Sequence, residues 1–192
     1  MERAVNDLSI KEEFKANWWW LVLPMLYTLV TILKFNFYDE SILLLLEFIF
    51  YGVFLVGIVK LTKYNSPILR YVYIAPYLII ELAFDVIFFI DYWYKESLFI
   101  IIFIILRCIC ELISPFIAIK TTEIFTFKVG INSTANLMLL CCVLVLVFNF
   151  ISNAIVSVCI YNYSDFLSSL IRYSIKYLLS LAGVGIATLM FS

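Results

Sequence analysis

The chain has 192 residues, of which 65% are hydrophobic and 14% are charged, and its mean hydropathy is +1.08. Soluble domains average about 45–50% apolar and about 25% charged residues, so this composition excludes an ordinary soluble core. The net charge is −1 without a dense basic run, so we expect no nucleic-acid partner. Histidine is absent, which excludes mechanisms that need an imidazole, such as the Ser-His-Asp triad.

Residues 1–17 are interpreted as a cytoplasmic N-terminal tail that precedes a helix bundle at 18–192. Ser9 to Glu12 fits a capping box, and Ile10 and Phe14 have the i,i+4 spacing of one helix face. We therefore expect a short helix on the inner membrane surface. The tail lacks the small-residue cleavage site of a signal peptide, so the first span is expected to act as its own insertion signal.

The rest of the chain consists of apolar segments separated by short breaks that carry charge, Pro or Asn. A helix of about 20 residues crosses the roughly 30 Å of bilayer hydrocarbon, and the apolar segments have this length. The sequence therefore predicts an all-α, polytopic transmembrane helix bundle with about six spans. The expected spans are 18–36, 41–59, 68–90, 97–119, 136–160 and 167–191. The polar stretch 120–135 is predicted to be a loop.

Lysine and arginine in the short connections lie mostly on one side of these spans, which the positive-inside rule assigns to the cytoplasm. We therefore predict a multi-pass protein of the cell membrane with both termini cytoplasmic. The residues on the predicted cytoplasmic side are Arg3, Lys11, Lys15, Lys60, Lys63, Arg70, Lys120 and Lys128, against Lys34 and Lys95 on the other side.

Polar and ionisable side chains within the spans are the most informative feature of the sequence. A charge at the bilayer centre costs about 2.5–3.5 kcal/mol on insertion scales, so we expect these side chains to face the bundle interior. Pairs one helical turn apart recur on three spans, which places both members of each pair on one face. The resulting track is predicted to comprise Glu47, Glu81, Asp85, Arg107, Glu111, Asn149 and Asn153.

Two interpretations of this track are open. In one, it is a proton or cation path with Glu81, Asp85 and Glu111 as titratable steps and Arg107 as a fixed positive partner. In the other, Arg107 pairs with Glu81 or Asp85, desolvation keeps Glu111 protonated, and the cluster only fixes helix register. Four carboxylates against one central arginine leave surplus acid, which favours the first.

The functional hypothesis is therefore a transporter or channel that passes protons, a cation or a small solute. The alternative is a non-catalytic membrane accessory protein, namely an immunity, assembly or partner-stabilising subunit. An enzyme is not predicted, because no nucleophile or phosphate-binding motif accompanies the acids, although an intramembrane carboxylate pair remains a third hypothesis. We predict no cofactor. A metal is undetermined, since oxygen ligands of the kind that Mg²⁺, Ca²⁺ or Mn²⁺ prefer could come from Glu47, Glu81, Asp85 and Glu111.

The sixth span carries two further signals. Arg172 and Lys176 are candidates for contact with a lipid headgroup or an anion, or they reach the interface as long basic side chains often do. Small residues at 182, 183, 185 and 187 predict close helix packing or a contact with a membrane protein partner or a second copy, through Gly183 and Ala187.

Residues 17–127 carry several motifs in a fixed order. Tryptophans begin the first span, an acid lies in the second, a basic loop with a proline precedes the third, and two dipeptides close the region. The residues are Trp18 to Trp20, Glu47, Lys60, Lys63, Pro67, Pro115-Phe116 and Thr126-Phe127.

In these features the region resembles an uncharacterised family of small four-span bacterial inner-membrane proteins. The family's basic SKRVK element is replaced here by Lys120-Thr121-Thr122-Glu123, and residues 136–192 have no counterpart in it. The resemblance implies a bacterial membrane location and no particular activity or functional residue.

Overall fold

A computed structural model describes residues 12, 15, 18, 22–36, 41–64, 67–93, 98–131, 133–160 and 163–191. Nearly all of these residues lie in α-helices or in one π-helix, and no strand occurs among them. The expected all-α helix bundle is confirmed. The interfacial helix expected near residues 9–14 lies outside the described residues, apart from the isolated position 12.

The long helices follow the apolar segments of the sequence closely. Four of them are long and apolar enough to cross a membrane, within Leu45–Lys63, Ile100–Val129, Thr134–Cys159 and Asp165–Met190, and the run Val22–Leu33 is a shorter apolar helix. These helices indicate a membrane protein, whereas six crossings stay a prediction. The elements are α2 (Val22–Asn36), α3 (Ser41–Tyr64), α4 (Pro67–Trp93), α5 (Leu98–Ile124), η2 (Phe125–Val129), α6 (Thr134–Ile160) and α7 (Tyr163–Phe191).

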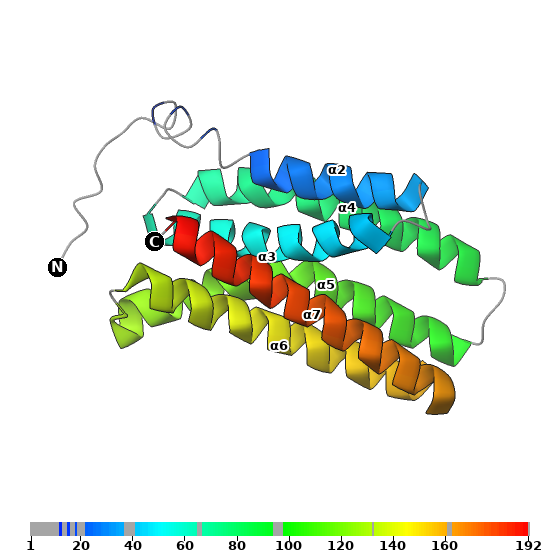
Figure 1. Cartoon of the computed structure of the whole chain (residues 1–192). Coiled ribbons are helices and arrows are strands. Elements are labelled where there is room, and N and C mark those ends of the chain that lie inside the picture. Colours follow the sequence, from blue (N-terminus) through cyan, green and yellow to red (C-terminus); the bar gives the residue numbers. More distant parts are fainter. Residues whose placement is uncertain are drawn as a thin grey trace.

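Helix α3 lies at the centre of the bundle (Figure 1) and packs against α2, α4, α5, α6 and α7. Its sequence is apolar around the whole circumference, which is typical of a helix buried on all sides. Leu55, Val56 and Ile58 are fully buried at its core. The start of α2 and the end of α7 lie at the same end of the bundle, where α5 also connects to α6.

Helices α3 and α7 approach each other at their glycines. A Cβ atom added to Gly183 would overlap the backbone carbonyl of Ile49, and one added to Gly52 would overlap the carbonyl of Ser180. Ala187 is also buried at this crossing. Gly183 and Ala187 are therefore buried within the chain and offer no outer surface to a partner or a second copy, whereas Ala182 is exposed and Gly185 has no neighbour within 4 Å of an added Cβ.

The segment predicted as a loop at 120–135 is mostly helical, so that prediction is wrong. The hydroxyl groups of Thr121 and Thr122 donate to backbone carbonyls of their own helix, those of Ile117 and Ala118, at 2.8 and 2.6 Å. Polar side chains that bond in this way do not require a loop. The helical backbone continues through η2 and stops at Gly130, which has φ 77° and the left-handed conformation that ends helices.

Candidate functional site

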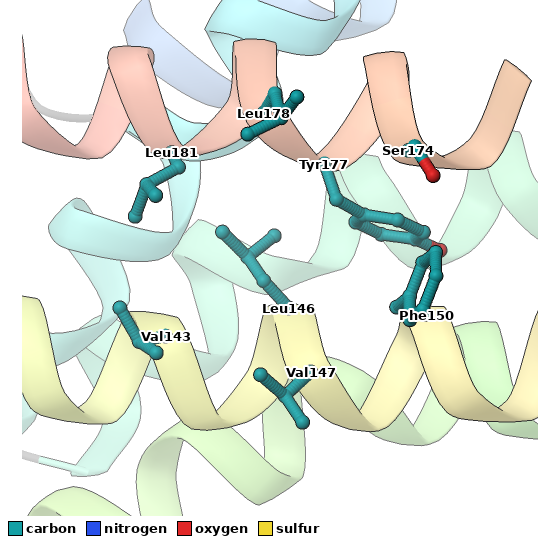
Figure 2. A pocket seen from close by; sticks show the side chains of 8 residues that line it. All are labelled: Val143, Leu146, Val147, Phe150, Ser174, Tyr177, Leu178 and Leu181. Atoms are coloured by element: carbon teal, nitrogen blue, oxygen red, sulfur yellow. The ribbon is translucent and has the colours of Figure 1, made fainter. Parts of the chain in front are cut away.

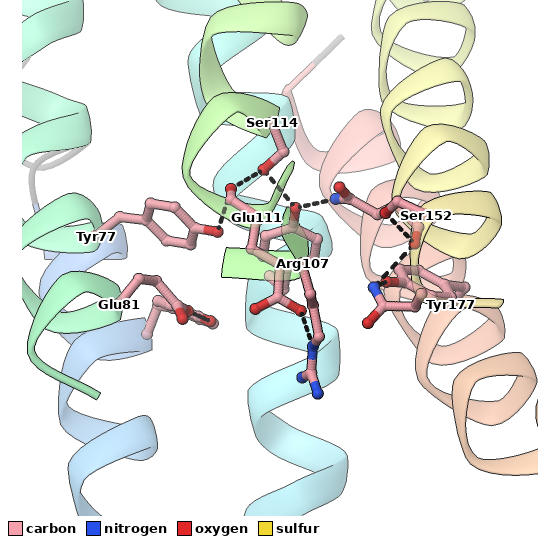
Figure 3. Close-up of polar contacts among 11 residues, drawn as sticks. Tyr77, Glu81, Arg107, Glu111, Ser114, Ser152 and Tyr177 are labelled. Atoms are coloured by element: carbon pink, nitrogen blue, oxygen red, sulfur yellow. Dashed lines mark hydrogen bonds and ion pairs between the residues drawn. The ribbon is translucent and has the colours of Figure 1, made fainter. Parts of the chain in front are cut away.

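Polar side chains from all the long helices meet about halfway along the bundle, in a region that we call the polar centre (Figure 3). Five residues of the predicted track belong to it, together with tyrosines, a serine and a lysine. Its members are Tyr27, Tyr51, Tyr77, Glu81, Arg107, Glu111, Ser114, Asn149, Asn153, Lys176 and Tyr177.

Glu81 projects from the middle of α4 toward α2. The hydroxyl of Tyr27 donates a hydrogen bond to its Oε1 atom at 2.7 Å. Glu81 makes no ion pair with any described residue. Within the described part of the chain, its carboxyl group therefore has a hydroxyl donor but no cation in direct contact.

Glu111 and Arg107 form an ion pair one turn apart on α5, with Arg107 Nε 3.3 Å from Glu111 Oε1. The guanidinium also lies 5.9 Å from the ring centroid of Tyr173. The prediction that Arg107 pairs with Glu81 or Asp85 is therefore wrong, because its ion-pair partner is Glu111. An i,i+4 partner on the same helix is reached without any change in helix packing, which explains the preference.

Two buried asparagines connect four helices through a hydrogen-bond network. Asn149 Nδ2 donates to the hydroxyl of Tyr51 at 2.8 Å, and that hydroxyl lies 3.1 Å from Ser114 Oγ. Asn153 Nδ2 donates to the hydroxyl of Tyr177 and to the backbone carbonyl of Asn149, both at 2.9 Å. The network links α3, α5, α6 and α7 inside the bundle.

Lys176 belongs to the polar centre, because α7 begins earlier than expected and the residue is therefore near mid-helix. Its ammonium lies 5.7 Å from the ring of Tyr177 and 5.9 Å from that of Phe48, and it interacts electrostatically with Glu111. Arg172 is exposed one turn away. The structure thus separates the two basic residues that the sequence had grouped as headgroup contacts.

Glu47 and Asp85 lie at the edge of the polar centre. Glu47 is buried on α3 and interacts electrostatically with Lys176. Asp85 lies beside Cys108 of α5, and its Oδ2 atom is buried without a hydrogen-bond partner. No group of three or more Cys, Asp or Glu side chains in the described part of the chain could hold a metal ion. The four acids considered as metal ligands therefore do not gather into one site.

Oxygen atoms without hydrogen-bond partners follow one face of α6. They are Asn149 Oδ1, Asn153 Oδ1 and Ser157 Oγ, which are buried on successive turns. Most buried polar atoms in proteins have a partner, so three such acceptors in a row are unusual. Amide, hydroxyl and carboxylate oxygens of this kind accept hydrogen bonds or coordinate hard cations.

Aromatic side chains fill the space between α2, α3 and α4. The ring of Phe54 stacks on those of Tyr77 and Tyr73, with centroids 4.8 and 5.3 Å apart, and on Tyr27 at 6.0 Å. The polar centre is therefore closely packed on this side. Two surface cavities of about 330 and 410 Å³ lie along α6 instead and are lined mainly by apolar residues.

The tyrosines of the polar centre were not singled out from the sequence. A usable signal existed on α4, where Tyr73, Tyr77, Glu81 and Asp85 recur at steps of four and so share one helix face. Tyrosine has an apolar ring with a polar tip, so it fits both a packed core and a polar site. Spacing relative to the acids thus distinguishes Tyr77, but it gives no signal for Tyr27, Tyr51 and Tyr177, which lie on other helices.

Comparison with protein-family models, curated proteins and solved structures finds no match to this chain. The resemblance of residues 17–127 to a four-span bacterial family stays a prediction from its motifs.

Proposed function

We propose that this chain is a membrane transport or conductance protein, in which a proton, a small cation or a small solute passes along the polar centre. In this proposal the helices cross a cell membrane six times, with both termini in the cytoplasm. The observation that carries it is the meeting of acidic and hydrogen-bonding side chains from every long helix in the middle of an apolar bundle.

The lack of an ion-pair partner for Glu81 among the described residues supports the proposal. Burying an unpaired carboxylate in an apolar medium is costly, and intramembrane acids usually mark an ion or proton pathway. Glu111 is ion-paired with Arg107, whereas the Tyr27 hydroxyl is the only hydrogen-bond partner of Glu81 among the described residues. Glu81 is therefore the acid that we assign to proton or cation exchange.

The acceptor oxygens on α6 support a path that extends beyond Glu81. Asn149, Asn153 and Ser157 place unpartnered oxygens over two helical turns, or about 12 Å along the axis. Asp85 adds a further unpartnered oxygen near α5. A proton on water, a cation or a polar solute would find partners along this length.

The test is a flux measurement in liposomes with Glu81→Gln. Glutamine keeps the size of the side chain and an acceptor for the Tyr27 hydroxyl, but it removes the titratable group. Purified protein is reconstituted with a pH-sensitive dye inside for H⁺, or with a Na⁺- or K⁺-sensitive dye for those ions, and the flux is followed under an imposed gradient. We expect the native protein to show pH-dependent flux and Glu81→Gln to lose most of it.

Asp165→Asn is the matched control, because Asp165 is exposed at the start of α7, far from the middle of the bundle. It should retain native flux, and both variants should keep the native elution volume and unfolding temperature. A folded Glu81→Gln protein with undiminished flux would refute the assignment of Glu81.

The accessory function is the second candidate, favoured by a specific observation. The ion pair, the aromatic stack and the asparagine network give the polar centre many internal contacts, as expected of a device that fixes helix register. The same liposomes distinguish the two functions. An accessory protein would give no flux above that of empty vesicles for any of the three ions, and changes in the polar centre would then alter only its stability.

A further inference from the structure

The two halves of the bundle differ in how closely their side chains pack. We define the closed half as residues 52–64, 67–77, 114–124, 134–146 and 178–191, which lie toward the end of the bundle where α5 connects to α6 (Figure 1). Every described hydrophobic residue that is at most 1% exposed lies in this half, including Phe54, Tyr73, Leu137 and Val184. Side chains without exposed surface leave no room for water, so the closed half is dry.

The remaining residues of these helices form the open half, which lacks such packing. On α4 no described side chain from Leu78 to Ile90 is buried, and on α7 none is buried from Asp165 to Lys176. The arginines show the same contrast. The side chain of Arg107 is 31% exposed although it lies well inside α5, whereas that of Arg70, close to the start of α4, is only 7% exposed.

An aromatic layer formed by Phe54 and Tyr73 separates the polar centre from the closed end. Tyr77 belongs to the polar centre, and Arg70 lies seven residues before it on α4, or about 10 Å along the axis. Between them the ring of Tyr73 stacks on that of Phe54, with centroids 5.3 Å apart. A Cβ atom added to Gly57 would overlap the Tyr73 hydroxyl. The layer is therefore too closely packed to admit water or an ion.

An ion pair between α4 and α5 covers the closed side of this layer. Arg70 Nη1 donates to Glu123 Oε1 at 2.8 Å. The second carboxylate oxygen of Glu123 accepts from Lys120 Nζ at 2.9 Å, one turn away on the same helix. The Nε atom of Arg70 is buried without a hydrogen-bond partner. One charge-assisted contact thus joins the two helices here, and it would break if α4 and α5 moved apart.

The surface cavity between α6 and α7 offers no polar route around the layer (Figure 2). Its polar side chains, Ser174 and Tyr177, lie at the end toward the polar centre. The hydroxyl of Ser174 already donates to the backbone carbonyl of Leu170 at 2.9 Å. The cavity continues toward the closed end between Leu178, Leu181 and apolar side chains of α6, where an ion would find no partner.

We propose that the structure is the inward-closed state of the transport path, in which the aromatic layer and the Arg70–Glu123 ion pair form an inner gate. This inference rests on the proposed function. Water and the transported species reach the polar centre from the open half, where Arg107 is already exposed. Release to the other side requires α4 and α5 to separate at Arg70, as helices do when packed bundles switch between two arrangements. In the proposed topology the gate faces the cytoplasm.

The test is the labelling of native cysteines by a charged, membrane-impermeant thiol reagent. Cys108 is half-buried in the open half, beside Asp85, whereas Cys141 and Cys142 are fully buried in the closed half. The full-length protein is placed in vesicles, the reagent is added to one side at a time, and labelled peptides are identified by mass spectrometry. Lys128→Cys marks the side of the closed end, because Lys128 is exposed there.

We expect the reagent to label Cys108 only from the side opposite this marker. Cys141 and Cys142 should stay unlabelled from both sides. Tyr173→Cys supplies a second reporter in the open half, since the ring of Tyr173 is half-buried next to the guanidinium of Arg107. It should be labelled from the same side as Cys108.

Glu123→Gln tests the ion pair. Loss of a charge-assisted contact should make the labelling of Cys108 from the marker side at least about tenfold faster, the factor that corresponds to about 1.4 kcal/mol. Lys120→Gln is the matched control, because it removes the contact within α5 and leaves the Arg70–Glu123 pair in place. The double variant Arg70→Glu, Glu123→Arg should restore one-sided labelling. Arg70→Gln replaces Glu123→Gln if that variant does not fold.

Several results would overturn the proposal. Labelling of Cys108 in the native protein from both sides, or from the marker side alone, would show that the closed half is not a barrier. Absence of labelling at both Cys108 and Tyr173→Cys would show that water does not enter the open half. One-sided labelling of a folded Glu123→Gln protein, or an equal rise in Lys120→Gln, would remove the ion pair from the gate.

The labelling does not depend on flux, so the two proposals fail in different ways. Absence of flux for every ion, with one-sided labelling, would refute the transport on which the gate rests. Flux through a native protein that is labelled from both sides would refute the gate and leave the proposed function standing.

Discussion

Replacing Gly183 by alanine should destabilise the fold, because α3 and α7 touch there through their backbones. The added Cβ atom would overlap the carbonyl oxygen of Ile49 and would also meet its carbonyl carbon and Cα. Backbone atoms of a central helix cannot move aside independently as a flexible side chain can. Relief therefore requires the two helices to separate, which disturbs the packing of Ala187 as well.

Gly185→Ala supplies a matched control on the same helix. A Cβ atom at this position has no neighbour within 4 Å. Both substitutions gain about 0.5–1 kcal/mol from the higher helix propensity of alanine, and this gain cancels in the comparison. The difference in unfolding free energy thus measures overpacking at Gly183, for which about 1–3 kcal/mol is expected.

Thermal unfolding in detergent at several protein concentrations measures this difference. Gly183→Ala should unfold at a lower temperature than Gly185→Ala, with a midpoint that does not depend on protein concentration, because the contact is within one chain. Equal midpoints for the two variants would refute the close approach of α3 and α7. A concentration-dependent difference would instead indicate that Gly183 lies between two copies.

Two further substitutions probe the polar centre. Tyr27→Phe removes the hydroxyl donor to Glu81 and should cost about 1 kcal/mol of stability while changing the pH dependence of flux in liposomes. Asn153→Ala leaves the buried hydroxyl of Tyr177 without its donor and creates a cavity, so we expect a loss of about 2–4 kcal/mol in thermal unfolding. An exposed substitution on the same helix, Val158→Ala, should change stability by less than about 0.5 kcal/mol.

The positions of the helices could be predicted from the sequence because apolar runs of membrane length are a strong local signal. The sequence did not allow us to predict which helices lie next to one another. Helix α3 is apolar on all sides, so its sequence indicates burial but gives no direction toward any partner. The close approach of α3 and α7 depends on Gly52 and Gly183, which lie far apart in the sequence, and neither glycine alone indicates which helix it packs against. The segment 120–129 was misjudged because threonine is as suited to a loop as to a helix whose carbonyls it can bond.

The acids of the candidate site were predictable for a different reason. A charge in an apolar run is rare and costly, so Glu81, Arg107 and Glu111 are conspicuous in the sequence. Their partners are not conspicuous, since Tyr27 lies on another helix and looks like any aromatic core residue. The partner of Arg107 also depended on side-chain geometry that spacing alone leaves open.

The chemistry of the two central acids differs in a way that bears on the proposed function. Protonation of Glu111 would remove the charge that holds Arg107, leaving a partly buried guanidinium without its anion. Protonation of Glu81 has no such consequence, because a neutral carboxyl group still accepts a hydrogen bond from Tyr27 through its carbonyl oxygen. Glu81 can therefore gain and lose a proton while α2 and α4 stay bonded. Of the two acids, it is the one that can cycle within an intact bundle.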